Sequence, residues 1–159
     1  FEVVSADFPD IETSKYHIDI LTAHFVRNPD WFDVVVGSNL FGDILSDLGP
    51  AVTGTIGIAP GANINPEGDF PSMFEPVHGS APDIAGQGIA NPLATILSFS
   101  MLLRYSFDMA DDADMIDKAA ENVLAGGLRT ADIMEEGKAR VSTETMGEAI
   151  ISELEKLAG

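Results

Sequence analysis

A continuous apolar run between two helix-like segments constrains the fold of this chain more than any other feature. The run FDVVVG, residues 32–37, is rich in β-branched side chains and ends at a glycine. Such a run is typical of a strand that is buried on both faces of a parallel sheet. Residues 15–27 carry apolar side chains at helical spacing before an Asn-Pro stop signal, and a second helix-like segment follows the run. The order of helix, buried strand and helix predicts an α/β fold.

The charge of the chain argues against several classes of partner. Its 159 residues include 26 Asp and Glu against 8 Lys and Arg, a formal net charge of −18. So negative a surface repels phosphate backbones and anionic lipid, and we expect neither nucleic acid nor a membrane as a partner. The acidity fits a halophilic protein, because salt screens self-repulsion, and it also fits an ordinary acidic protein. Without cysteine the chain has no disulfide framework and no thiolate site.

Helices are predicted for most of the C-terminal part of the chain. The longest apolar stretch, residues 93–103, is too short to span a bilayer and predicts a buried helix. Asn91 is a plausible cap for this helix, with Pro92 in its first turn. Two further helices are expected within residues 108–127 and 142–159. At the other end of the chain, residues 2–6 are expected to form a short strand.

Between these parts lies a long segment that is rich in glycine and proline, residues 51–92. A packed domain rarely carries that much loop without a binding task. Within it, residues 75–91 read EPVHGSAPDIAGQGIAN. Gly79 would let backbone approach a ligand, and Asp83 could accept hydrogen bonds from a ribose diol while repelling a 2′-phosphate. Asn91 could bond an adenine edge; a purely structural loop is the alternative.

A second candidate site lies in NLFGDILSDLGP, residues 39–50, where Asp43 and Asp47 are four residues apart. In a helix this spacing places both carboxylates on one face, where they repel each other. One interpretation makes Asp43 an N-cap and Asp47 a first-turn acid. The other makes the pair ligands of Mg²⁺ or Mn²⁺, completed by a substrate or a third acid. Asp19, alone among apolar neighbours, is the candidate third acid, unless it simply faces solvent.

Other catalytic signatures are missing from the sequence. The acidic cluster of residues 108–117 lacks the glycine and glutamate of a calcium loop and is interpreted as a solvated helix face. GQGIAN does not follow a strand and ends in asparagine, so it is not a Rossmann fingerprint. Neither a nucleophile elbow nor a phosphate-binding P-loop occurs.

The two motifs NLFGDILSDLGP and FEPVHGSAPDIAGQGIANP, in this order, closely resemble the β-decarboxylating dehydrogenases, the family of isopropylmalate, isocitrate, tartrate and D-malate dehydrogenases. The flanking sequence, residues 16–84, looks most like the tartrate and D-malate branch. The resemblance implies an isopropylmalate dehydrogenase-like α/β fold, with a parallel or mixed sheet flanked by helices, of which this chain is the C-terminal half. Residues 1–53 would end the central, dimer-forming and substrate domain, and residues 54–159 would form the C-terminal part of the cofactor-binding domain.

The resemblance also implies roles for individual residues. Asp43 and Asp47 would bind Mg²⁺ or Mn²⁺ chelated by a small 2-hydroxy acid, and Asp19 would reach that site from the other subunit of a homodimer. The loop would hold the adenosine half of NAD, with Asp83 and Ile84 resembling NAD-using members. The residues expected at the cofactor are Glu75, His78, Gly79, Ser80, Ala81, Asp83, Ile84 and Asn91.

The implied activity is that of a cytoplasmic oxidoreductase acting on tartrate or D-malate. It would oxidise the C2 hydroxyl by hydride transfer to NAD⁺ and then release CO₂, leaving an enolate whose charge the metal stabilises. The family's catalytic Tyr and Lys lie upstream of the matched segment, and Lys15 and Tyr16 do not match them, so we expect no catalytic residue here and no activity from these residues alone. The alternatives are a 3-isopropylmalate dehydrogenase and a non-catalytic module that binds metal and adenosine.

Overall fold

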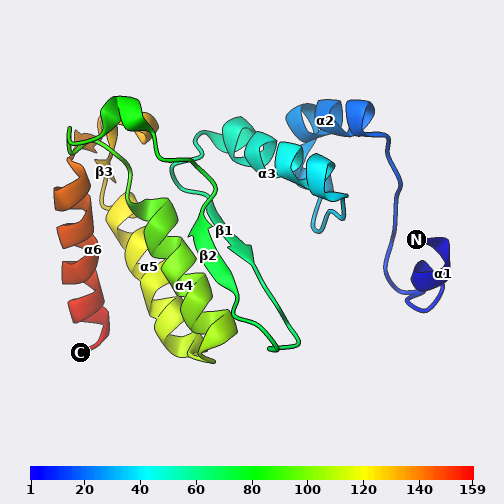
Figure 1. The fold of residues 1–159 in the computed structure, drawn as a ribbon. Helices are drawn as coiled ribbons and strands as arrows, with labels where there is room; N and C mark the ends of the chain where they lie inside the picture. The colour runs from blue at the N-terminus through cyan, green and yellow to red at the C-terminus, as the bar shows by residue number, and fades with distance from the viewer. The chain divides into compact units, whose positions relative to one another are not determined.

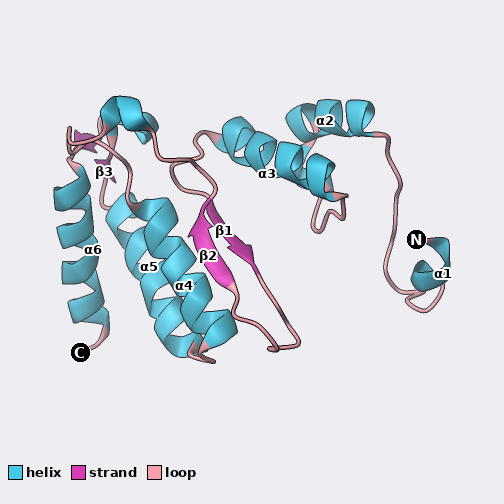
Figure 2. Ribbon diagram, in the orientation of Figure 1, coloured by secondary structure: helices cyan, strands magenta, loops and turns pink.

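The computed structural model describes residues 1–159, which divide into two compact units, residues 1–49 and residues 50–159 (Figures 1 and 2). Short helices dominate the first unit, and three longer helices with two small sheets make up most of the second. Helix α3 (Asn39–Thr53) begins in the first unit, and its last residues belong to the second.

The first unit contains the helix that the sequence predicts before the apolar run. Helix α2 spans Ile18–Arg27 and buries Leu21. It ends where the Asn-Pro signal predicts. The backbone N–H of Asn28 donates to the backbone carbonyl of His24 over 2.7 Å. At the N-terminus of the chain, the prediction of a strand is wrong, because Glu2–Ser5 form the short helix α1.

The predicted strand at residues 32–37 is also wrong. This segment adopts no regular secondary structure, and the side chains of Val34 and Val36 are 85% and 92% exposed. A buried parallel strand needs strands beside it and helices over both faces. Both strand pairs of the structure lie within residues 60–140, so the apolar run has no sheet to join within the first unit.

Sheet structure in the second unit is smaller than the parallel or mixed sheet that the sequence predicts. Strands β1 (Pro60–Asn63) and β2 (Met73–Pro76) form an antiparallel pair. Strands β3 (Leu128–Arg129) and β4 (Ala139–Arg140) form a parallel pair. The hairpin falls inside the segment that the sequence predicts as loop, because PGAN has none of the β-branched residues that mark a strand.

Three helices form the core of the second unit, as predicted. Helices α4 (Leu93–Ser106) and α5 (Ala110–Ala125) lie side by side, with α6 (Thr143–Leu157) packed on α5 (Figure 1). Ala113, Ala119 and Ala120 on α5 are fully or almost fully buried and let the neighbouring helices approach closely. The core cluster consists of Leu93, Ala119, Ala120, Val123, Met146 and Ile150. No helix in the structure is long and apolar enough to cross a membrane.

Candidate functional site

The two acids of the possible metal site lie on one exposed face of α3. This helix begins at Asn39, so Asp43 lies one turn inside it and the N-cap interpretation of Asp43 is wrong. Asp43 and Asp47 are both exposed, whereas Leu45 between them is buried. Because residues four apart stack on a helix, two carboxylates are available to one ligand on this face.

The third candidate ligand, Asp19, lies in the first turn of α2. Its Oδ1 accepts the backbone N–H of Ile20 over 2.8 Å. Within residues 1–159 no group of three His, Cys, Asp or Glu side chains lies close enough to hold a metal ion. Carboxylate oxygens suit a hard divalent cation, but Asp43 and Asp47 supply only part of its coordination. These two carboxylates alone therefore do not make a complete metal site.

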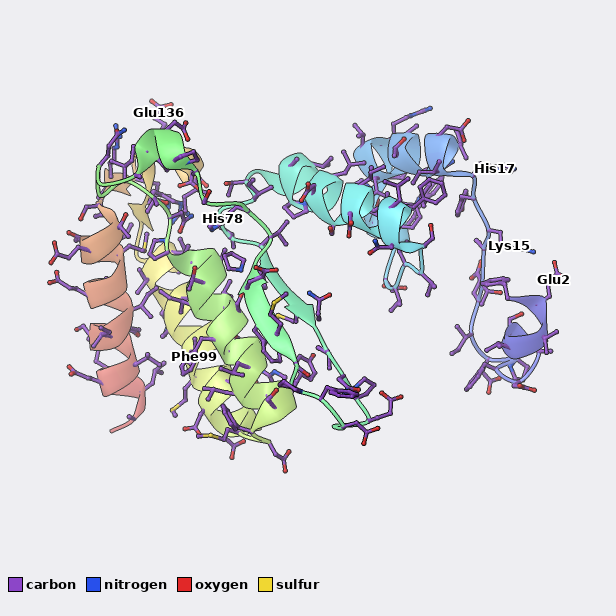
Figure 3. The ribbon with its side chains drawn as sticks, viewed as in Figure 1. Glu2, Lys15, His17, His78, Phe99 and Glu136 are labelled. Atoms are coloured by element: carbon purple, nitrogen blue, oxygen red, sulfur yellow. The ribbon has the colours of Figure 1, made fainter.

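The candidate cofactor loop begins on β2 at Glu75 and continues past His78, which Figure 3 labels in the segment after that strand. The Nδ1 atom of His78 lies 2.9 Å from the carbonyl oxygen of Gly79. The carboxylate of Asp83 is exposed in a short 3₁₀ turn, Pro82–Ile84. The backbone carbonyl of Asp83 accepts a hydrogen bond from Nε2 of Gln87 over 2.8 Å. This bond does not use the Asp83 carboxylate, which is available to a ligand.

The loop contains backbone conformations that residues other than glycine rarely adopt. Ala81 is left-handed, with φ 41° and ψ 61°, immediately before a proline. Gly86 and Gly88 have φ values of 76° and 65°. Left-handed non-glycine residues are strained, and such strain clusters at ligand-binding segments. The strain at Ala81 therefore marks the segment that contains Gly79 and Asp83 as a candidate for ligand binding.

The side chain of Asn91, the last residue of the loop, has the first of the two roles that the sequence suggests, as a cap of α4. Its side chain is 8% exposed. Its Oδ1 accepts the Leu93 N–H over 3.0 Å, so it satisfies a free donor at the start of α4, as predicted for a cap. Its Nδ2 donates to Asp132 over 3.1 Å. Both side-chain amide atoms of Asn91 are therefore engaged within the chain.

Asp132 is the acceptor at the centre of a polar cluster that the sequence analysis missed. Its carboxylate accepts hydrogen bonds from Thr130 over 2.6 Å, from Thr55 over 2.9 Å and from the Asn91 amide. Burial alone would raise the pKa of the Asp132 carboxyl, but these three hydrogen bonds hold it below its ordinary value. Asn91 and Thr55 are 41 and 77 residues away in sequence, so no local pattern could have identified them.

The start of α6 holds the same end of the loop. The Thr143 N–H donates to the Gly88 carbonyl over 2.9 Å, and the Thr143 hydroxyl donates to the Ala90 carbonyl over 2.5 Å. Neither contact was predicted, because Ala90 lies 53 residues from Thr143 and no local pattern connects them. Ser142 has that role: its Oγ accepts the Thr145 N–H over 3.1 Å.

A hollow of about 650 Å³ lies elsewhere in the second unit. Ile58, Leu97 and Ile133 contribute to its largely apolar wall, and Asp132 is also among its lining residues. None of the residues expected at the cofactor lines it. The hollow is therefore separate from the exposed loop that carries Asp83.

Comparison with known proteins places this arrangement in a family. The family model described as isocitrate/isopropylmalate dehydrogenase matches residues 1–150. The chain is 56% identical over 154 residues to a 3-isopropylmalate dehydrogenase of Paramagnetospirillum magneticum, covering 95% of this chain and 42% of that protein. It is 55% identical to a 3-isopropylmalate dehydrogenase of Gluconobacter oxydans, covering 99% of this chain and 43% of that protein. The chain thus spans less than half the length of these relatives.

Solved structures show the same relationship. An isocitrate dehydrogenase from Methylococcus capsulatus superposes with a TM-score of 0.88 at 40% identity, covering 96% of this chain and 44% of that one. A β-decarboxylating dehydrogenase from Thermococcus kodakarensis superposes with a TM-score of 0.78 at 44% identity, covering 97% of this chain and 43% of that one. The isopropylmalate dehydrogenase-like fold predicted from the sequence is confirmed. The chain belongs to the isocitrate/isopropylmalate dehydrogenase family.

Proposed function

We propose that the protein to which these residues belong is an NAD-dependent oxidoreductase that oxidises and decarboxylates a 2-hydroxy dicarboxylic acid. The observation that carries this proposal is the family match over residues 1–150, which contains both candidate sites. The substrate that the comparisons favour is 3-isopropylmalate, because the relatives with 55–56% identity are named 3-isopropylmalate dehydrogenase. Tartrate and D-malate remain second candidates, supported only by the resemblance of residues 16–84 to that branch.

The cofactor in this proposal is NAD, which accepts the hydride from the substrate. Asp83 has the exposed carboxylate needed to accept hydrogen bonds from the ribose hydroxyls, and the same charge disfavours a 2′-phosphate. Gly79 has open space where a side chain would project, so backbone can approach the cofactor. We assign the adenosine half of NAD to the loop from Glu75 to Asn91, including His78, Ser80, Ala81 and Ile84.

A divalent cation, Mg²⁺ or Mn²⁺, is the second cofactor that we propose. Asp43 and Asp47 would hold it together with the 2-hydroxy acid, and Asp19 of the second subunit would complete the site. When bound, such a cation stabilises negative charge that develops on the substrate oxygen.

The proposal assigns a role to each part of the chain. Residues 1–53 would belong to the dimer-forming and substrate domain of a cytoplasmic enzyme, and residues 54–159 to its cofactor-binding domain. The boundary between the two compact units of the structure falls after Gly49. It reflects which residues pack together, whereas the proposed boundary after residue 53 separates the two functional domains. No residue of this chain is proposed as the acid or base of the reaction.

The test of this proposal is a substrate panel with the full-length protein. NAD⁺ and Mn²⁺ are supplied, and the initial rate is compared for 3-isopropylmalate, isocitrate, D-malate and tartrate. The proposal expects the highest kcat/KM with 3-isopropylmalate. A preference for D-malate or tartrate would move the substrate to the second candidate, and no turnover despite binding of Mn²⁺ and NAD⁺ would favour the non-catalytic module.

A further inference from the structure

The end of the cofactor loop is held in place by a residue that lies far from it in the sequence. Thr143, the first residue of α6, makes two hydrogen bonds to this loop, from its N–H to Gly88 and from its hydroxyl to Ala90. We propose that Thr143 is a positioning residue for the adenosine half of NAD, because it fixes the backbone of residues 88–91. This inference rests on the proposed function and adds to it a residue outside the loop.

The two hydrogen bonds restrain a part of the loop that contains a left-handed glycine. Gly88 has a φ of 65°, a conformation that only glycine adopts easily, and it lies in an exposed stretch of loop. The Thr143 hydroxyl reaches the Ala90 carbonyl from 53 residues away. A loop held before the ligand arrives loses less conformational entropy on binding, so it binds more tightly.

A second anchor acts on the next residue. Asn91 is held by its bonds to Asp132 and to the N-terminus of α4. The loop end is thus tied to α6 at Gly88 and Ala90, and to the Asp132 cluster at Asn91. Its backbone groups, which we assign to the adenine, are fixed from two sides.

The hydroxyl of Thr143 is not needed to cap its own helix. Ser142 is the N-cap of α6, and its Oγ accepts the N–H of Thr145 over 3.1 Å. Removing the Thr143 hydroxyl therefore leaves the cap in place and removes one bond to the loop. Thr145, on the same turn, is exposed, and its hydroxyl accepts a hydrogen bond from the Ser142 hydroxyl over 3.0 Å instead of bonding the loop. Thr145→Val therefore also removes one hydroxyl hydrogen bond, but not one to the loop, which makes it a matched control.

The experiment compares Thr143→Val with Thr145→Val in the full-length protein. Valine keeps the β-branched shape of threonine and removes only the hydroxyl. Thr143→Ser, which restores a hydroxyl, is the rescue variant. Binding of ADP-ribose, which has the adenosine half of NAD and no nicotinamide, is measured by calorimetry. Hydrogen exchange of the amides of residues 86–90 reports on the loop directly.

We expect Thr143→Val to weaken ADP-ribose binding about three- to tenfold, as loss of one hydrogen bond predicts. Amide exchange in the loop should become faster, and KM for NAD⁺ should rise by a larger factor than kcat falls. Thr145→Val and Thr143→Ser should behave as the unsubstituted protein does. Equal ADP-ribose affinity of Thr143→Val and the unsubstituted protein would overturn the positioning role alone.

Two further outcomes separate this inference from the function on which it rests. If the unsubstituted protein binds neither NAD⁺ nor ADP-ribose, the proposed function and the positioning role both fail. If Thr143→Val fails to fold, Thr143→Ala is compared with Thr145→Ala by the same binding measurement. A loss of affinity equal for both substitutions would contradict a role that is specific to Thr143.

Discussion

Asn91 and Asp132, which are 41 residues apart in sequence, are joined by a hydrogen bond of 3.1 Å between the amide Nδ2 and the carboxylate Oδ2. The other amide atom of Asn91 accepts the N–H of Leu93. One side chain therefore links the end of the candidate cofactor loop, the start of α4 and the segment that follows β3. This link ties the end of the loop to the folded core of the second unit.

The first prediction concerns this pair. Asp132→Asn places two amide groups face to face, and we expect it to lower the free energy of unfolding by about 1–2 kcal/mol, an amount reduced by partial exposure. The double variant, Asn91→Asp together with Asp132→Asn, again pairs one amide donor with one carboxylate acceptor. It should recover most of the lost free energy of unfolding. Urea denaturation of the two variants and the unsubstituted protein measures both changes. Additive losses in the double variant would show that the bond is not formed.

The stabilisation by Asp132 should depend on pH. The pKa of Asp132 is lowered on folding from an ordinary value of 3.8, so the folded state favours the charged form. Its contribution is therefore present above about pH 4 and is lost as the pH falls through the folded pKa. The stability difference between the unsubstituted protein and Asp132→Asn should shrink between neutral pH and pH of about 3. A difference that grows with acid would have the wrong sign.

A third prediction tests the carboxylates of α3. Asp43→Asn and Asp47→Asn should each weaken Mn²⁺ binding at least about tenfold, because each removes a charged ligand. Both side chains are exposed, so the melting temperature without metal should change little. Glu148→Gln, an exposed acid on α6, removes the same charge as a control. Calorimetric titration of the full-length protein gives the affinities. A loss of Mn²⁺ affinity as large in the control would point to a general effect of charge.

The fourth prediction concerns the choice of cofactor. Asp83→Asn removes the charge that disfavours a 2′-phosphate and weakens the acceptor for ribose hydroxyls. We expect kcat/KM for NAD⁺ to fall about tenfold while the ratio of NAD⁺ to NADP⁺ efficiency declines. The measurement is steady-state kinetics with both cofactors. An unchanged ratio would remove Asp83 from the ribose site.

The acidity of the chain supports a fifth prediction. With 26 acids against 8 bases, repulsion among surface charges should be relieved by salt. The melting temperature of the full-length protein should rise as KCl is increased toward molar concentration. A flat or falling melting temperature would contradict salt adaptation and leave an ordinary acidic surface.

Local patterns predicted the helices well. The spacing of apolar residues and the Asn-Pro stop predicted α2, and the apolar stretch from Leu93 predicted α4 with Asn91 at its start. These signals act within a few residues of one another. The expected roles of Asp19, Asp43 and Asp47, and of the loop around Asp83, came from resemblance to a family and stay predictions.

Features that depend on distant partners were not predictable. The run at residues 32–37 has the composition of a buried strand, yet Val34 and Val36 are exposed because no neighbouring strand pairs with them. The contacts that tie Asp132 and Thr143 to the loop have no local signature, since Asn91 lies 41 residues from Asp132 and Ala90 lies 53 residues from Thr143. Sequence patterns report which residues favour an element, and the tertiary structure decides whether that element forms.

The measurement that tests the central claim most directly follows NADH and CO₂ together in the full-length protein. The protein is supplied with NAD⁺, Mn²⁺ and 3-isopropylmalate, and both products are quantified against the acid consumed. An NAD-dependent, β-decarboxylating dehydrogenase produces one NADH and one CO₂ for each molecule of acid, and a chelator that removes Mn²⁺ stops both. Production of neither from 3-isopropylmalate, isocitrate, D-malate or tartrate, by a protein that binds NAD⁺ and Mn²⁺, would contradict it.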